Sequence, residues 1–193
     1  MHPVAAIANL LIVALWAIWV IVWTVAAFFV KRTRRKEVLG AMLQERVAVV
    51  AGAVVLIRPA WLPRILRQHF WIERPGLALV ALALVICGML FAYWARVHLG
   101  RNWSGQVIVK VDHALITSGP YRWVRHPIYA GMLTALAGTA LATSAPYGFI
   151  GLALILFGFL VRVRLEEALM RETFPAEYDR YSQHTARLIP GVF

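Results

Sequence analysis

Apolar residues along this chain gather in five stretches separated by polar or charged segments. The stretches are Val4–Val30, Arg46–Leu62, Gly76–Val97, Ile128–Thr143 and Tyr147–Val163. The first is uncharged, and as a helix rising about 1.5 Å per residue it exceeds a hydrocarbon core of about 30 Å. It is too long for the apolar part of a signal peptide, and no basic segment precedes it. It therefore predicts a retained transmembrane helix.

The other four stretches predict further membrane helices. Ser144-Ala145-Pro146 separates the last two stretches, which indicates a tight helical hairpin. Arg58 and Pro59 interrupt the second stretch, so that helix could instead end at Ile57. The fold class expected from this pattern is an all-α integral membrane protein with five transmembrane helices.

The composition supports a membrane protein. Hydrophobic residues make up 61% of the 193 residues, against about 45–50% in soluble domains, and the mean hydropathy is +0.70. We expect one membrane domain over residues 1–193, with three spans in 1–98 and the site-bearing loop, hairpin and tail in 99–193.

The net charge of +11 follows the predicted topology. Sixteen Lys and Arg residues flank one set of span ends and four flank the other, which predicts an outside N-terminus and a cytoplasmic C-terminus. This pattern indicates contact with membrane lipids and argues against a nucleic-acid partner. The sixteen are Lys31, Arg32, Arg34, Arg35, Lys36, Arg46, Arg96, Arg101, Lys110, Arg122, Arg125, Arg162, Arg164, Arg171, Arg180 and Arg187, and the four are Arg58, Arg64, Arg67 and Arg74.

Cysteine and histidine offer no metal chemistry. Cys87 is the single cysteine and lies within a span, so no disulfide within the chain can form. The six histidines show no close pair of the kind that binds metals, so no metal site is expected.

Two patterns of side chains predict helix packing. Trp16, Trp19 and Trp23 share one face of the first span, which indicates a packing or lipid-facing stripe. In the fourth span a small residue recurs at every fourth position from Ala130 to Ala142, so we expect spans four and five to pack closely.

The segment from Leu99 to Pro127 is too long and too aromatic for a simple connector. We expect it to form a cytoplasmic lid or cofactor cradle. The tail from Leu165 to Phe193 predicts an extension of span five, followed by a short amphipathic helix that begins at Pro175 and could cover this loop.

Polar side chains concentrate where the hairpin begins and ends. The segment Gly119–Gly131 reads GPYRWVRHPIYAG, and the far arm ends in Arg162 followed by Glu166 and Glu167. Such groups are costly at the edge of a bilayer, so they indicate a functional site.

At these residues the chain resembles the isoprenylcysteine carboxyl methyltransferase family of membrane enzymes and, more distantly, phospholipid methyltransferases and sterol reductases. The resemblance covers Leu99 to the end. The matching elements are NWS at 102–104, Gln106, HALITSGPY at 113–121, RHPIY at 125–129, Arg162, Glu166-Glu167, FPAEY at 174–178 and RLIP at 187–190.

The resemblance implies an S-adenosylmethionine-dependent carboxyl O-methyltransferase acting on a lipophilic or prenylated substrate. Arg162 would face the substrate. The implied cofactor contacts are Gln106, His113, Ala114, Leu115, Ile116, Tyr121, His126, Pro127, Ile128, Tyr129 and Glu166.

The residue types suit this chemistry. Glu166 can accept hydrogen bonds from an ammonium or hydroxyls, and Tyr121 and Tyr129 offer aromatic faces to an adenine or a sulfonium. Pro127 begins a helix whose N-terminus favours a carboxylate. Arg162 favours a carboxylate acceptor, which is already ionised and needs no general base.

Structural alternatives accompany each assignment. Arg162 and Glu166 stand four residues apart and could pair only with each other. We expect Glu167 to be solvated or paired with Arg164 or Arg171. Arg122 and Arg125 could serve only as interfacial anchors.

Other functions also remain open from the sequence. They are a phospholipid amine N-methyltransferase, an NADPH-dependent sterol-reductase-like protein and a membrane scaffold without enzymatic activity.

Overall fold

The computed structural model describes residues 2–28, 39–57, 59–69, 74–100 and 115–191. The longer elements are α1 (Pro3–Phe28), α2 (Leu39–Ile57), α3 (Pro75–Leu99), α4 (Pro127–Thr143), α5 (Pro146–Thr173) and α6 (Pro175–His184). Short 3₁₀ turns cover Pro59–Trp61, Arg64–Arg67 and Gly119–Arg122, named η1, η2 and η4. Within the described residues all regular structure is helical, as expected.

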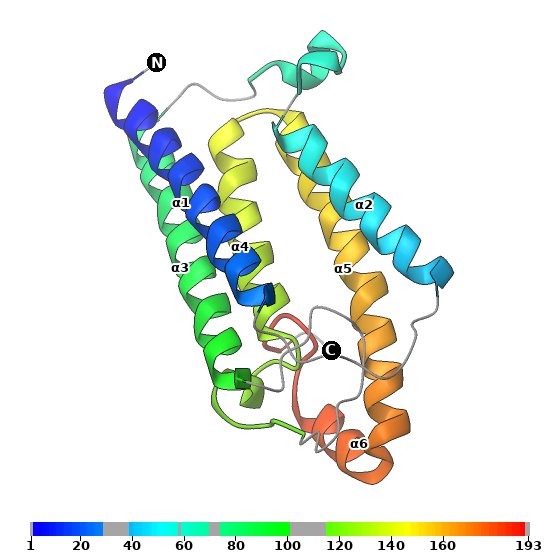
Figure 1. Cartoon of the computed structure of the whole chain (residues 1–193). Coiled ribbons are helices and arrows are strands. Elements are labelled where there is room, and N and C mark those ends of the chain that lie inside the picture. The colour runs from blue at the N-terminus through cyan, green and yellow to red at the C-terminus, as the bar shows by residue number, and fades with distance from the viewer. Residues whose placement is uncertain (1, 29–38, 58, 70–73, 101–114, 192–193) are drawn as a thin grey trace.

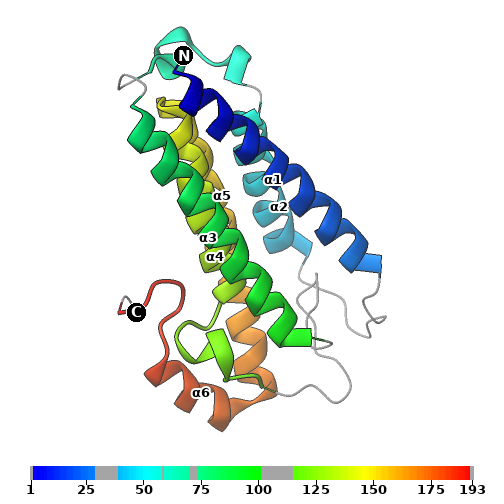
Figure 2. The same ribbon diagram turned by 90° about the vertical axis from the view of Figure 1, so that its left-hand side faces the viewer.

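Helices α1 to α5 form an elongated bundle, and α6 lies across one end of it (Figures 1 and 2). Helix α1 packs along α3, α3 along α4, and α2 along α5. The N-terminus, η2 and the turn between α4 and α5 lie at the end opposite to α6 (Figure 1).

Helices α1, α3 and α5 are long and apolar enough to cross a membrane, and α4 is a shorter apolar helix of 17 residues. Three of the five expected spans therefore meet this criterion within the described residues. The count of five stays a prediction, as do the cytoplasmic loop and the division of the chain at residues 98 and 99.

Several predicted boundaries are confirmed. Helix α4 ends at Thr143 and α5 begins at Pro146, where the left-handed Ser144 (φ 54°) makes the tight hairpin turn. Helix α5 runs on to Thr173, and α6 begins at Pro175. Proline suits the first turn of a helix because the N–H groups there have no partner within the helix.

The second helix differs from the expected stretch at its beginning. Helix α2 begins at Leu39, seven residues before Arg46, and ends at Ile57. The ending agrees with the shorter alternative, because Pro59 cannot continue a helix. The earlier start brings Glu45 into the helix, where it is buried.

The predicted close helix contact of α4 is made with α3 and not with α5. The glycines of α4 face α3, and a Cβ added to Gly131 would lie 2.5 Å from the Gly88 carbonyl oxygen. A Cβ on Gly138 would lie equally close to the Ala81 carbonyl oxygen. The two backbones can approach this closely only because these positions lack side chains.

Aromatic residues of α1 pack as expected. Trp16 donates a hydrogen bond to the hydroxyl of Thr139 on α4 at 2.9 Å, and Trp19 stacks on Trp23 with ring centroids 4.0 Å apart. Trp16 packs against both buried clusters of the bundle, one around Val85 and one around Ile155. The stripe therefore connects α1 to the rest of the bundle.

Candidate functional site

The candidate site lies where α4 begins and α5 leaves the bundle. Pro127 occupies the first helical position of α4 and is fully buried, which fixes His126 directly before the helix. One turn of α5 carries Glu166 and Glu167 toward His126 and Tyr129. Charged side chains divide there into two groups that meet at His126.

The first group, the Arg162 cluster, contains Glu45, Tyr129, Arg162 and Glu166. Arg162 Nε donates to the Tyr129 hydroxyl at 2.7 Å and to Glu166 Oε1 at 3.0 Å. The Tyr129 hydroxyl donates to the same Glu166 oxygen at 2.7 Å. Arg162 Nη1 lies 3.7 Å from Glu45 Oε1 on α2. The alternative that Arg162 and Glu166 pair only with each other is therefore wrong.

The second group, the Glu167 cluster, contains Arg125, Glu167, Arg171 and Arg187. The Glu167 side chain is 1% exposed. It accepts hydrogen bonds from Arg125 Nε at 2.9 Å and from Arg187 Nη2 at 2.9 Å. Arg171 lies within 3.6 Å of its second oxygen. The expected pairing with Arg171 is confirmed, but the expectation of a solvated Glu167 is wrong.

Arg125 connects the loop to the tail. Its guanidinium donates to the carbonyl oxygens of Ser182 (2.8 Å) and Thr185, and its backbone N–H donates to Ala186 at 2.8 Å. His126 N–H donates to the Arg187 carbonyl at 3.2 Å, and Val124 pairs with Ala186 in a single parallel bridge. The tail thus lies against the loop, as predicted, and Arg125 is more than an interfacial anchor.

His126 lies between the two clusters. Its Nδ1 is 3.5 Å from Glu166 Oε2 and its Nε2 is 3.4 Å from Glu167 Oε1. Burial opposes a charge on the ring, but the two carboxylates outweigh that effect and raise the pKa of His126 above its ordinary value. A protonated His126 therefore contributes positive charge between two acids.

The other predicted contacts are spread around this centre. Tyr121 is buried against α3, where its hydroxyl donates to the Ala95 carbonyl at 3.4 Å, and its own carbonyl accepts from Tyr181 at 2.6 Å. Ile128 is partly buried in the first turn of α4, and Leu115 and Ile116 are partly buried before η4. Gln106, His113 and Ala114 lie outside the described residues.

Sequence reasoning missed two members of the site. Glu45 lay just outside the predicted second span, although an acid at the start of an apolar helix indicates a functional position. Arg187 was noted only among the basic residues that flank the spans and as part of a matching motif. Its partner Glu167 stands 20 residues away along the chain, so no local spacing reveals the pair.

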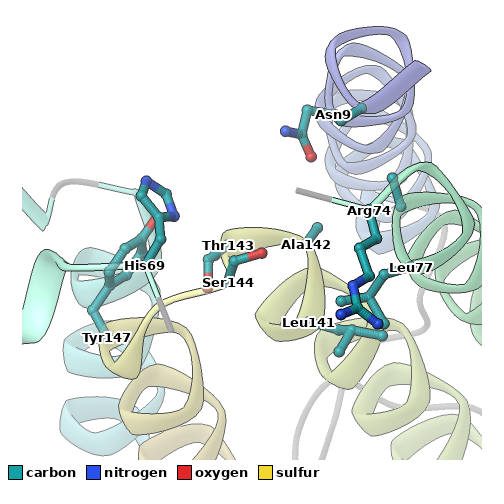
Figure 3. Close-up of a pocket in the computed structure, with 11 residues that line it drawn as sticks. Asn9, His69, Arg74, Leu77, Leu141, Ala142, Thr143, Ser144 and Tyr147 are labelled. Atoms are coloured by element: carbon teal, nitrogen blue, oxygen red, sulfur yellow. The ribbon is translucent and has the colours of Figure 1, made fainter. Parts of the chain in front are cut away.

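A separate hollow lies at the opposite end of the bundle. It has a volume of about 220 Å³ and is lined by residues from α1, α3 and the turn between α4 and α5. In Figure 3, His69 lies beside Tyr147, whereas Arg74 points toward Leu77 and Leu141. These polar groups do not converge on one point, so the chemistry concentrates at the other end.

Known proteins are similar to the part of the chain that holds the candidate site. Residues 80–172 match the model of the "Isoprenylcysteine carboxyl methyltransferase (ICMT) family". Protein-S-isoprenylcysteine O-methyltransferase B of Arabidopsis thaliana is 29% identical over 66% of this chain and 64% of its own length. The corresponding protein of Saccharomyces cerevisiae is 34% identical over 56% of this chain and 47% of its own.

A solved structure is also similar in fold. It is described as the eukaryotic intramembrane Ras methyltransferase, isoprenylcysteine carboxyl methyltransferase, and superimposes with a TM-score of 0.55 at 25% identity. The match covers 77% of this chain and 53% of that chain, so this chain spans only part of the relatives it matches. The family match, the relatives and the shared fold therefore show that this chain is similar to proteins of the isoprenylcysteine carboxyl methyltransferase family.

Proposed function

We propose that this protein is an S-adenosylmethionine-dependent O-methyltransferase that esterifies a lipophilic carboxylate of the isoprenylcysteine type. The observation that carries the proposal is the placement of Arg162. Tyr129 and Glu166 hold its Nε at 2.7 and 3.0 Å, and it stands one helical turn closer to the apolar part of α5 than Glu166. A guanidinium so oriented suits an acid held at the edge of the bilayer.

The acceptor requires no base in this reaction. Its carboxylate oxygen forms a bond to the methyl carbon while the bond from that carbon to sulfur breaks, and an ester and a thioether result. No proton moves. The chain must orient the acid and exclude water. Arg162 supplies the orientation, and Tyr129 and Glu166 restrict the directions in which Arg162 can point.

The residues of the Arg162 cluster fit the cofactor that the family resemblance implies. When bound, S-adenosylmethionine supplies a methyl group on a positively charged sulfur. Glu166 Oε1 already accepts two hydrogen bonds, whereas Oε2 faces His126 at 3.5 Å, longer than a typical hydrogen bond. Oε2 can therefore still accept from an ammonium or a ribose hydroxyl. Cofactor contacts by Gln106 and the 113–116 segment are part of this proposal.

The proposed topology has five crossings, with the N-terminus outside and the C-terminus in the cytoplasm. Two features of the bundle support it. Helix α2 packs along α5 and α4 along α3, both of which are long enough to span. The start of α4, the end of α5 and α6 lie at one end of the bundle (Figure 2), and Arg164, Arg171 and Arg180 belong to these elements.

A methylation assay with purified full-length protein and labelled cofactor tests the proposal. The acceptors are an N-acylated S-farnesyl cysteine acid, its carboxamide, and phosphatidylethanolamine in vesicles. We expect label in a base-labile methyl ester of the acid and none in the amide. Label in the phospholipid instead would overturn the carboxylate assignment.

A melting-temperature measurement addresses the cofactor separately. S-adenosylmethionine should raise the melting temperature and NADPH should not, because only a ligand that binds the folded state stabilises it. The reverse result would point to reductase chemistry.

A further inference from the structure

Glu45 is an acid on α2 that neither the sequence pattern nor the matched region, residues 80–172, assigns to the site. It is 8% exposed, and its carboxylate lies 3.7 Å from the Arg162 guanidinium. Burying a carboxylate is costly unless its partners repay the lost hydration. The position of Glu45 therefore calls for an explanation.

The packing of α2 on α5 determines where Glu45 lies. A Cβ added to Gly158 would lie 3.0 Å from the Glu45 carbonyl oxygen and 2.8 Å from Val49 Cγ2. The backbone of α2 at Glu45 thus rests directly on α5, one helical turn before Arg162. Gly52 and Gly151 make a similarly close contact farther along the two helices. Glu45 is consequently held near Arg162 by backbone packing, and does not depend on the ion pair for its place.

The contact between Glu45 and Arg162 is longer than the hydrogen-bonded ion pairs of the site. Arg162 Nε lies 3.0 Å from Glu166, and Arg125 and Arg187 each lie 2.9 Å from Glu167. A separation of 3.7 Å is too long for a charge-assisted hydrogen bond, which is typically about 2.7–2.9 Å. A carboxylate that makes such a hydrogen bond to Arg162 would therefore be favoured over Glu45.

We propose that Glu45 is a specificity-determining residue that occupies the place of the acceptor carboxylate at Arg162. This inference rests on the proposed function. Acid binding displaces the Glu45 contact, because two carboxylates compete for the same end of one guanidinium. Once the acid has become a neutral ester, it no longer competes for Arg162 and Glu45 regains the contact. A neutral acceptor does not compete with Glu45, so the residue lowers the affinity for charged acceptors only and thereby sets how strongly the site prefers an acid over its ester.

The proposal predicts that removing the charge of Glu45 strengthens binding of the acid acceptor. Glu45→Gln keeps the size of the side chain but removes the competitor. The KM for the S-farnesyl cysteine acid should fall roughly three- to tenfold, which corresponds to the loss of a weak competing ion pair of about 1 kcal/mol. The KM for the cofactor should remain within twofold. Glu177→Gln, an exposed glutamate on α6, is the matched control and should change neither constant.

A binding measurement keeps the test independent of turnover. Acid and methyl ester are titrated against the wild type and Glu45→Gln, with the thioether product of the cofactor present. The Kd of the acid should fall three- to tenfold in the variant, while that of the ester stays within twofold. A Kd for the acid that rises or does not change would overturn the role of Glu45.

The two proposals fail in distinguishable ways. A wild type that methylates no carboxylic acid contradicts the proposed function. A wild type that methylates the acid, with an unchanged or raised KM in Glu45→Gln, contradicts only the inference about Glu45. Unfolding of the variant is checked by its melting temperature, which should stay near that of Glu177→Gln.

Discussion

Two neighbouring glutamates on α5 have opposite environments. Consecutive residues of a helix point about 100° apart, so Glu166 faces α4 and Arg162 while Glu167 faces the loop and the tail. The Glu167 side chain is 1% exposed and has three arginine partners, one of them from the far end of the described chain. The Glu166 side chain is 24% exposed and has one oxygen without a short hydrogen bond.

This contrast indicates that the Glu167 cluster stabilises the fold, whereas the Arg162 cluster is suited to binding a ligand. The Glu167 cluster has three cations around one acid, and its short contacts join the loop, α5 and the tail. The Arg162 cluster has two acids around one cation, and its contacts range from 2.7 to 3.7 Å. A fully satisfied buried charge has little capacity left for a ligand, whereas a partly satisfied one does.

The largest effect should follow Glu167→Ala. The substitution leaves the 7% exposed Arg125 without its carboxylate, and breaking a buried pair in this way typically costs about 3–5 kcal/mol. We expect a lower melting temperature and rapid proteolysis after Thr173, measured on protein in detergent. Glu177→Ala on the same tail should leave both unchanged. A stable Glu167→Ala protein with an intact tail would show that the Glu167 cluster does not hold the tail in place.

Arg162→Ala should have a smaller effect on stability and a large one on turnover. Loss of charged hydrogen bonds to the acceptor corresponds to about 2–3 kcal/mol, or roughly a hundredfold in kcat/KM. Arg162→Lys should recover only part of the rate because lysine lacks the planar fork. Cofactor affinity, measured by titration with the thioether product, should change little. An equal loss of cofactor affinity in Arg162→Ala and Glu166→Ala would show that Arg162 acts only by positioning Glu166 and does not bind the acceptor.

Tyr129→Phe should have an intermediate effect. The variant removes a hydroxyl that donates to Glu166 and accepts from Arg162, both at 2.7 Å. Loss of such contacts typically costs about 1–1.5 kcal/mol, so we expect roughly a tenfold fall in kcat/KM with a nearly unchanged melting temperature. A large loss of stability instead would show that the Arg162 cluster also holds the fold.

The smallest effect should be a dependence of stability on pH. The folded-state pKa of His126 is raised, so its charged form stabilises the protein fully below the unfolded value of about 6.5. This contribution is lost as pH rises through the higher folded-state pKa. The melting temperature should therefore decline above pH 6.5, and His126→Gln should flatten that decline. An identical pH profile in the variant would remove His126 from the link between the two clusters.

The apolar stretches and the positions of prolines predicted much of the fold. Long apolar runs gave α1 and α3, and prolines at 127, 146 and 175 marked the beginnings of α4, α5 and α6. The start of α2 at Leu39 was missed because the charged residues Glu45 and Arg46 resemble the boundary of an apolar stretch. Only the contact with Arg162 on another helix explains why an acid is tolerated there.

The sequence also indicated which residues form the site, but not how they divide into the Arg162 cluster and the Glu167 cluster. It indicated Arg162, Glu166, His126 and Tyr129 as site residues, and hydrogen bonds and an ion pair join these residues in the fold. It did not reveal that Glu167 organises the tail, because that role depends on Arg125 and Arg187 approaching from separate segments. Likewise, the small residues at every fourth position from Ala130 to Ala142 predicted a close helix contact but assigned it to the fifth span, whereas the glycines of α4 lie against α3.

The docking of the tail has a consequence for the order in which the protein is made. Ser182 to Arg187 are synthesised after every helix of the bundle, yet they supply the carbonyls and the guanidinium that surround Arg125 and Glu167. Until they emerge, Arg125 and His126 lack the backbone hydrogen bonds that Ala186 and Arg187 accept. A nascent chain whose helices have already entered the bilayer therefore lacks contacts at the end that holds the candidate site, and residues 182–187 supply them only after all five helices of the bundle have been translated.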